Sequence, residues 1–311
     1  MFKKISLAFT LAASLLSASS VEYGKGTFSM EGGFLGLSSQ IDCDISTYTL
    51  KTEHSNIGKF YYGYNLSWYD SDTLRQAQKT YNSLAKDANG FLWNSIGGSK
   101  SATIPAMNYR IKGLDANLRL GYDIMHQDKD NYFGIGLLLG VSLPTIDANK
   151  GDSVAPDLGF MYNSAGTLLK AKDLFSKSKT EFTTYKIGPT LSFQRALVDK
   201  RLFLYATASY AYQNASIKNS LAKTELSADG IFQSYDIGLK FVPLQKELKT
   251  RLFTLNPSLY GTLGYRYSSW ELKKVAIDTS GNEISSDLLK PLKHDFTMSI
   301  STAYLGFGYS F

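Results

Sequence analysis

The chain has few of the residues that build catalytic and metal sites. Its 311 residues include one cysteine, three histidines and seven prolines. Because Cys43 is alone, no disulfide can form within the chain, and no cluster of Cys and His predicts a zinc site. His54, His126 and His294 lie far apart, and His294 with its acidic neighbour has no second catalytic pair to act with. The sequence therefore predicts no catalytic residues, no enzyme activity, no metal and no cofactor.

Long apolar runs and a strong charge bias are also missing. After residue 20 no run approaches the roughly 18 apolar residues that indicate a transmembrane helix, which excludes a helical membrane protein. Lysine and arginine number 33 against 27 acidic residues, and no long basic run occurs. Nucleic-acid binding needs a clustered positive charge, so we expect no nucleic-acid partner.

The first twenty residues have the pattern of an export signal. Lys3 and Lys4 form a basic start, and residues 5–16 form an apolar stretch too short to span a bilayer. Residues 17–20 (SASS) supply small side chains for cleavage. A buried N-terminal helix is the alternative. We predict a signal peptide at 1–20 and a single exported domain at 21–311.

Alternation is what the chain has in quantity. In residues 60–70 (FYYGYNLSWYD) apolar and aromatic side chains occupy every second position, and the last nine residues (AYLGFGYSF) repeat the pattern. A period of two is that of a β-strand with one apolar face. Similar segments recur at 111–124, 133–143, 185–193, 202–212, 231–241 and 253–267. With two less regular segments at 26–37 and 41–51, the sequence predicts ten strands, and eight or twelve remain alternatives.

The first strand is the least regular. Phe28, Met30 and Phe34 share one parity and are predicted on the apolar face. This assignment places Glu31 on the polar face. The apolar parity then changes at Leu35, which predicts a β-bulge.

The composition of the two faces indicates the solvent. One face is apolar and rich in Tyr and Phe, whereas the other carries Gly, Ser, Thr, Asn and scattered charges. A membrane barrel has an apolar exterior and a polar lumen, whereas a soluble sheet packs branched apolar residues inside. A secreted soluble β-protein is therefore the alternative. Connections also alternate between short (53–59, 126–131, 196–200, 243–250) and long (71–108, 144–180, 214–229, 269–294).

With its signal peptide, its strands and its ending, the chain resembles the Gram-negative outer-membrane β-barrel proteins, a small barrel of the opacity/porin-like kind. The fold implied is all-β, a closed up-and-down antiparallel transmembrane barrel. In that family the barrel-assembly machinery reads an outward-facing C-terminal aromatic, here in the series Leu305, Phe307, Tyr309 and Phe311. The resemblance implies an outer-membrane location, contact with membrane lipid and lipopolysaccharide, and that machinery as a partner during biogenesis.

Eight charged residues carry the parity of the lumen face. They are Glu31, Asp115, Arg119, Asp123, Lys186, Asp236, Lys240 and Arg266. Unpaired charges are costly in a narrow interior, so these residues either pair or contact water. An eight-stranded barrel fills its interior with side chains and sixteen strands leave a wide channel, so a barrel of ten strands lies near the closed end of this range. We therefore predict a charge network in a mostly closed lumen, with a pore lining as the alternative.

Two long connections carry helical spacing, and two strands carry proline. Residues 73–88 and, more weakly, 167–178 place apolar residues at helical intervals, which predicts short helices there. Pro189 and Pro257 fall inside strands and predict a bulge at each position, because proline donates no ladder hydrogen bond.

Two functions fit these features. The first is a non-enzymatic surface barrel that displays loops for adhesion or envelope contacts, including a host surface ligand. The second is a narrow, porin-like channel for small polar solutes.

Overall fold

The computed structural model describes most of the chain after residue 19. The described residues are 20–34, 37–52, 55–57, 59–76, 79–82, 101–104, 106–125, 131–150, 160–162, 168–170, 177–198, 201–220, 225–244, 248–249, 254–255, 259–279, 282–283 and 296–309. The three histidines, Phe311, Pro257 and residues 1–19 of the predicted signal peptide lie outside this set.

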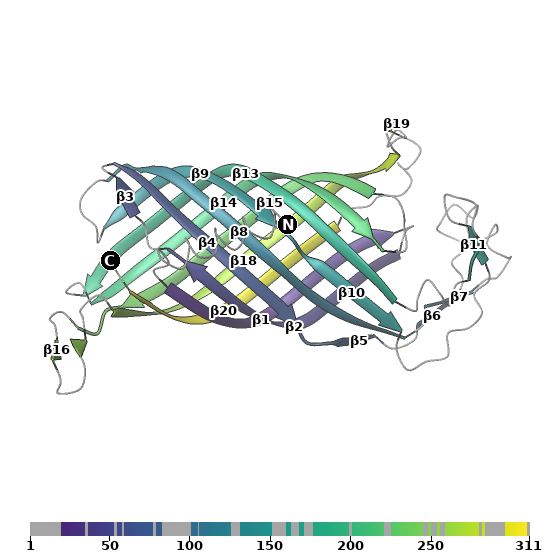
Figure 1. Ribbon diagram of the computed structural model, residues 1–311, viewed down its shortest axis with the longest axis horizontal. Helices are drawn as coiled ribbons and strands as arrows, with labels where there is room; N and C mark the ends of the chain where they lie inside the picture. The colour runs from purple at the N-terminus through teal and green to yellow at the C-terminus, as the bar shows by residue number, and fades with distance from the viewer. Residues whose placement is uncertain are drawn as a thin grey trace, which may run out of the picture.

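Ten long antiparallel strands form a closed ring (Figure 1). They are β1 (Ser20–Phe34), β2 (Leu37–Lys51), β4 (Phe60–Ser71), β8 (Met107–Asp123), β9 (Tyr132–Ser142), β13 (Lys177–Val198), β14 (Leu202–Asn219), β15 (Glu225–Phe241), β18 (Leu259–Thr279) and β20 (Phe296–Tyr309). Each pairs with the next, and β20 pairs with β1 from Ser20↔Gly308 to Gly32↔Phe296. Closure leaves no open edge in the ring, which a strand surrounded by lipid requires. The predicted all-β, up-and-down barrel is confirmed.

Short strands extend the ring or lie beyond it. β10 (Thr145–Lys150) follows β9 after Pro144 and, like β9, pairs with β8 on one side and with β13 on the other. β3 (Ser55–Ile57) pairs with β4, and β5 (Leu74–Gln76) pairs with β8. The remaining short strands are β6 (Lys79–Asn82), β7 (Ser101–Ile104), β11 (Phe160–Tyr162), β12 (Leu168–Lys170), β16 (Leu248–Lys249), β17 (Thr254–Leu255) and β19 (Asn282–Glu283).

We call the two ends of the barrel the turn end and the loop end. The turn end holds the connections β2–β4, β8–β9, β13–β14 and β15–β18, together with β16 and the C-terminus (Figure 1). The loop end holds the other connections, with β6, β7, β11 and β19.

The predicted helices are wrong where the structure describes them. Leu74–Gln76 and Lys79–Asn82 are strands within 73–88, and Leu168–Lys170 is a strand within 167–178. Strand pairing with a neighbour overrides helical spacing in such short segments. Among the described residues no helix is long and apolar enough to cross a membrane.

The predicted bulge at Pro189 is also absent. The pairing with β14 keeps one register across Pro189, from Ile187↔Tyr212 to Thr190↔Ser209. The strand therefore accommodates the side chain of Pro189 without an extra residue. β1 keeps one register with β2 from Ser20 to Phe34, and Leu35, where the first-strand bulge is predicted, lies outside the described residues.

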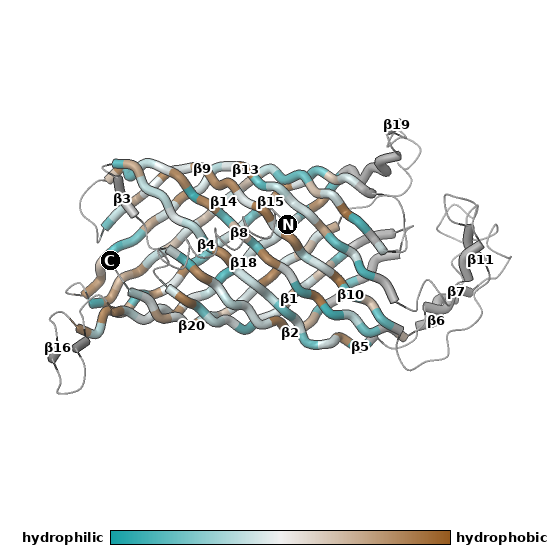
Figure 2. Tube along the Cα trace, in the orientation of Figure 1, coloured by the Kyte–Doolittle hydropathy of each residue, from teal (hydrophilic) through white to brown (hydrophobic). Residues whose placement is uncertain are grey.

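The outer surface carries an apolar belt, because the exposed large side chains of the strands are mostly apolar. Figure 2 shows the underlying alternation of hydrophobic and hydrophilic residues along the strands. Outward residues of the belt include Ile237, Leu263, Leu305 and Phe307, which are 51%, 55%, 62% and 81% exposed. Aromatic pairs border it: the rings of Phe60 and Tyr122 lie 5.6 Å apart near the turn end. Towards the loop end the Tyr23–Tyr48 and Tyr235–Tyr267 ring pairs form the second border. An apolar band between two aromatic girdles is the surface that a bilayer covers.

Beyond the second border the faces exchange polarity. On β8, Arg110 and Lys112 are exposed on the outside, while Ile111 between them is fully buried inside. On β18, Lys273 is exposed and Leu272 is fully buried. The strands therefore continue past the belt with an apolar interior and a polar exterior, as in a soluble barrel.

Because of this exchange of polarity, two predictions are wrong: the long loop at 214–229 and the facing of the first strand. The predicted long loop at 214–229 is mostly strand, because β14 runs to Asn219 and β15 begins at Glu225. Phe28 is 1% exposed and points inward, so β1 has the opposite facing to the one predicted. Glu31 is accordingly exposed on the outer surface and does not line the lumen.

Candidate functional site

The lumen is the candidate site, because most of the charged residues predicted on the inner face point into it. Its middle level holds a charge cluster from four strands: Glu22 on β1, Lys51 on β2, Asp236 on β15 and Arg266 on β18. Asp236 Oδ2 lies 2.9 Å from both Lys51 Nζ and Arg266 Nη2. Arg266 Nη2 also lies 2.6 Å from Glu22 Oε2, and its Nη1 donates to Thr49 Oγ1 at 2.9 Å. Two acids balance two bases, so the cluster is neutral.

Tyrosines complete this cluster. Tyr304 donates its hydroxyl to Asp236, and Tyr205 and Tyr304 share a hydrogen bond of 2.7 Å. The Arg266 guanidinium lies 4.7 Å from the Tyr304 ring centroid. Gly264 makes room for that ring, because a Cβ there would lie 2.5 Å from the Tyr304 hydroxyl.

A second cluster lies closer to the loop end. Lys186 Nζ lies 2.5 Å from Asp115 Oδ1, and the lysine side chain is fully buried. Asp115 also accepts from Ser142 Oγ and from Asn117 Nδ2, the latter at 2.6 Å. The Lys186 ammonium lies 3.9 Å from the Phe232 ring centroid, a cation–π contact. The ammonium and the carboxylate therefore have partners that lower the cost of burial, whereas Asn117 Oδ1 accepts no hydrogen bond.

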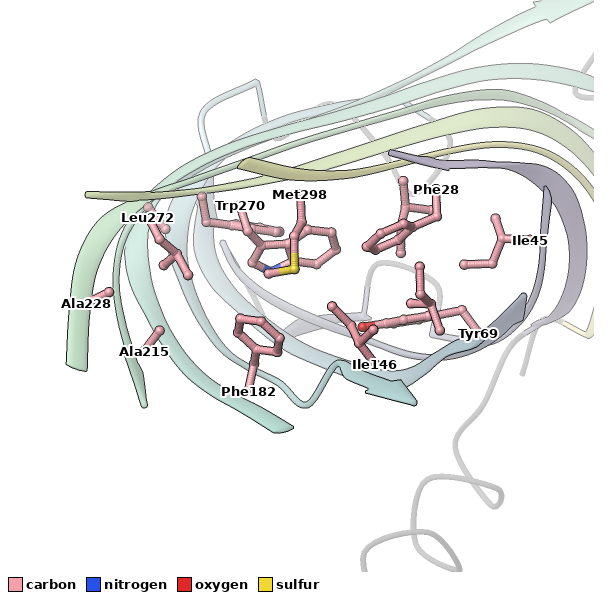
Figure 3. Packing of buried hydrophobic residues seen from close by; sticks show 14 of the residues in the cluster. Phe28, Ile45, Tyr69, Ile146, Phe182, Ala215, Ala228, Trp270, Leu272 and Met298 are labelled. Carbon is pink, nitrogen blue, oxygen red and sulfur yellow. The ribbon is translucent and has the colours of Figure 1, made fainter. Parts of the chain in front are cut away.

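An apolar plug fills the loop-end part of the lumen (Figure 3). We define it by its buried residues: Phe28, Cys43, Ile45, Tyr69, Ile111, Leu138, Ile146, Phe182, Ala211, Ala215, Ala228, Phe232, Trp270, Leu272, Met298 and Ile300. Figure 3 shows labelled members pointing into the barrel from opposite walls.

Contacts cross the whole lumen at three levels. Lys51 on β2 reaches Asp236 on β15 at 2.9 Å, four places away around the ring. Trp270 Nε1 on β18 donates to Ser142 Oγ on β9 at 3.0 Å, again four places away. Phe182 on β13 and Phe296 on β20 have ring centroids 5.8 Å apart. Side chains thus bridge opposite walls of the barrel at each level.

The other predicted lumen residues have separate surroundings. Asp123 is 1% exposed and accepts from the backbone N–H groups of Met125 and Phe133, which fastens the β8–β9 turn. Lys240 lies 4.2 Å from the Tyr260 ring centroid near the turn end. Arg119 is 9% exposed, points into the lumen and belongs to neither cluster.

Sequence reasoning missed Glu22 and Lys51, which complete the middle cluster. Glu22 precedes the predicted first strand, and Lys51 ends a strand whose facing was unclear. The signal that could have found them is the opposite parity of β1, in which Glu22, Gly24, Gly26 and Phe28 point inward together.

Two small cavities remain between these side chains. One, of about 50 Å³, is lined by polar groups of the two clusters, and the other, of about 60 Å³, lies towards the turn end. Cavities of this size hold a few water molecules or one small ion.

The C-terminal strand lies as its alternation predicts. Leu305 and Phe307 point outward, and Tyr309 continues that side of β20. β20 closes the barrel against β1, so the last strand meets the first.

The known proteins to which this chain is similar are solved structures. No protein-family model matches the chain, and no curated protein matches it. The chain is similar to the outer membrane protease OmpT from Escherichia coli, at 11% identity and a TM-score of 0.45, over 94% of this chain and 97% of that one. It is also similar to the outer membrane protein OprG from Pseudomonas aeruginosa, at 11% identity and a TM-score of 0.31, over 95% and 97%.

A third similarity, to the attachment invasion locus protein Ail of Yersinia pestis, has 10% identity and a TM-score of 0.27, over 94% and 99% of the two chains. Similarities of this size say nothing about activity, so the geometry of the barrel itself carries the interpretation. A closed ring of antiparallel strands, an apolar outer belt, two aromatic borders and a polar lumen beneath an apolar plug are the architecture of an outer-membrane β-barrel protein.

Proposed function

We propose that the protein is a non-enzymatic barrel of the Gram-negative outer membrane, with a lumen that does not conduct, and that it displays surface segments for adhesion or envelope contacts. The observation that carries this proposal is the set of cross-lumen contacts at three levels, Lys51–Asp236, Trp270–Ser142 and Phe182–Phe296. A solute path would have to break ion pairs and displace packed aromatic rings.

The polar outer surface beyond the belt supports a role at the cell surface. There the strands carry mixed charges, among them the Arg110–Asp70 pair at 2.5 Å and the Lys112–Asp147 pair at 2.7 Å. Such side chains suit water and the phosphate groups of lipopolysaccharide, whereas the belt below suits lipid tails. The exposed Phe307 supports recognition by the barrel-assembly machinery.

Conductance separates this proposal from the channel alternative. We expect the full-length mature protein, inserted in a planar bilayer, to give no reproducible conductance steps at either polarity. Insertion is checked on the same preparation by the heat-dependent shift in gel mobility of a folded barrel. Stable steps that change in size in Arg119→Ala or Lys186→Ala would instead establish a narrow channel for small polar solutes.

Surface display is tested by epitope insertion. We expect a tag inserted between β6 and β7, within 83–100, to be labelled by antibody on intact cells. A tag inserted between β15 and β18, within 245–247, should be labelled only after the outer membrane is permeabilised. The reverse pattern would contradict the proposed orientation.

A further inference from the structure

Arg119 is a buried cation without a carboxylate partner. It is 9% exposed, and among the residues that the structure describes it forms no hydrogen bond and no ion pair. Lys51, Lys186 and Arg266, which also point into the lumen, each lie within 3 Å of a carboxylate oxygen. Arginine stays protonated in proteins, so Arg119 cannot lose its charge to avoid the cost of burial.

Arg119 borders both lumen cavities. In the cavity towards the turn end it is joined by Lys240 and by Thr262, whose Oγ1 is buried and has no hydrogen-bond partner. In the other cavity the facing groups include Asn65 and Ser209. The site thus offers one unpaired guanidinium, a second cation and an unused hydroxyl around a small polar space.

Carboxylates also border these cavities, and each is already engaged. Asp236 and Asp115 border the first cavity and are paired with Lys51 and Lys186. Glu22 borders the second: its Oε2 receives Arg266, and its Oε1, which accepts no hydrogen bond, lies 3.9 Å from Lys51 Nζ.

Asp236 attracts Arg119 electrostatically, but its carboxylate is already shared by Lys51 and Arg266. A buried cation without an ion pair of its own is stabilised by a counter-ion of opposite sign.

We propose that Arg119 holds a small monovalent anion of the size of chloride in the lumen, with Thr262 as a hydroxyl donor and Lys240 as the second cation. Cavities of about 50 and 60 Å³ fit a halide with a few waters and are too small for a sugar or a nucleotide. The anion balances the charge of the Arg119 guanidinium and completes the network of the closed lumen. This inference rests on the burial and charge of Arg119, whether or not the barrel conducts.

Bromide is the direct probe. Crystals of the full-length mature barrel grown with sodium bromide should show an anomalous peak in contact with the Arg119 guanidinium. Data from the Arg119→Gln variant should lack this peak and keep any peaks on the outer surface. A wild-type crystal in bromide with no peak beside Arg119 would overturn the inference.

Unfolding in solution gives a second readout. The wild-type barrel should be more stable in sodium chloride than in sodium gluconate at equal ionic strength. Its unfolding equilibrium constant should be about tenfold lower when chloride is ten times its Kd. Arg119→Gln should lose this difference, whereas Arg195→Gln, at an exposed position, should keep it.

Thr262→Val keeps every charge and removes only the hydroxyl, so it tests the site even if Arg119→Gln does not fold. We expect it to weaken the chloride effect. A chloride effect that is absent in the wild type, or unchanged in Arg119→Gln, contradicts the site.

Discussion

Lys186→Met is expected to lower the free energy of unfolding of the barrel by about 3–5 kcal/mol, the usual cost of removing one partner of a buried ion pair. The Lys186 side chain is fully buried, and its ammonium lies 2.5 Å from Asp115. Methionine fills similar space but leaves the Asp115 carboxylate without a counter-charge. The change is measured by reversible urea unfolding of the protein in lipid vesicles, followed by tryptophan fluorescence.

The double variant Lys186→Met/Asp115→Leu should recover most of this loss, because an apolar pair of similar volume often replaces a buried ion pair at little cost. A residual cost of about 1–3 kcal/mol remains for Ser142 and Asn117, which lose their acceptor. Lys179→Met is the control: its pair with Glu181 is half exposed and should contribute less than about 1 kcal/mol. A single-variant loss no larger than that of Lys179→Met would show that the buried pair is hydrated.

Ile237→Arg is expected to destabilise the barrel by about 2–4 kcal/mol, the cost of a cation in the middle of a lipid-facing surface. Ile237 points outward on β15, is 51% exposed and has Ala206 and Tyr265 as its strand neighbours. The folded fraction is read from gel mobility without heating and from urea unfolding in vesicles.

Gln233→Arg is the matched control for Ile237→Arg. Gln233 lies on the same strand and the same outer face, four residues closer to the loop end and beside the aromatic border. Near an interface an arginine costs about 0–1 kcal/mol. Equal losses at the two positions would place the bilayer elsewhere on the barrel.

The architecture could be predicted from the sequence because lipid imposes a simple rule on it. Any strand with an apolar outer face and a polar inner face alternates with a period of two, and eight of the ten predicted segments do so regularly. The ends of the strands could not be predicted from the same rule. Beyond Tyr212 and before Ile231 the outward apolar pattern stops, but the strands continue with Ala215 and Ala228 turned inward.

The lumen was harder to predict than the wall. Parity identified Asp115, Lys186, Asp236 and Arg266 as inward residues, but it does not say which of them meet. Lys51 and Asp236 are 185 residues apart in sequence, and their contact depends on the summed register of five strands. Glu31 was misplaced because three apolar residues of β1 suggested lipid, whereas its apolar residue Phe28 belongs to the plug.

Cysteine reactivity along β18 tests the central claim most directly, namely that the barrel exchanges polarity at its aromatic border and is filled beyond it. In a Cys43→Ser background, single cysteines replace Tyr265, Leu272 and Lys273, and each is treated with a water-soluble maleimide in lipid vesicles. We predict rapid reaction at position 273, which is outside and above the belt, and protection at 265 by lipid and at 272 by the plug. Brominated lipids should quench a fluorophore at position 265 and leave one at 273 unquenched. Reaction at 272 as fast as at 273 would mean a water-filled lumen and would contradict this account.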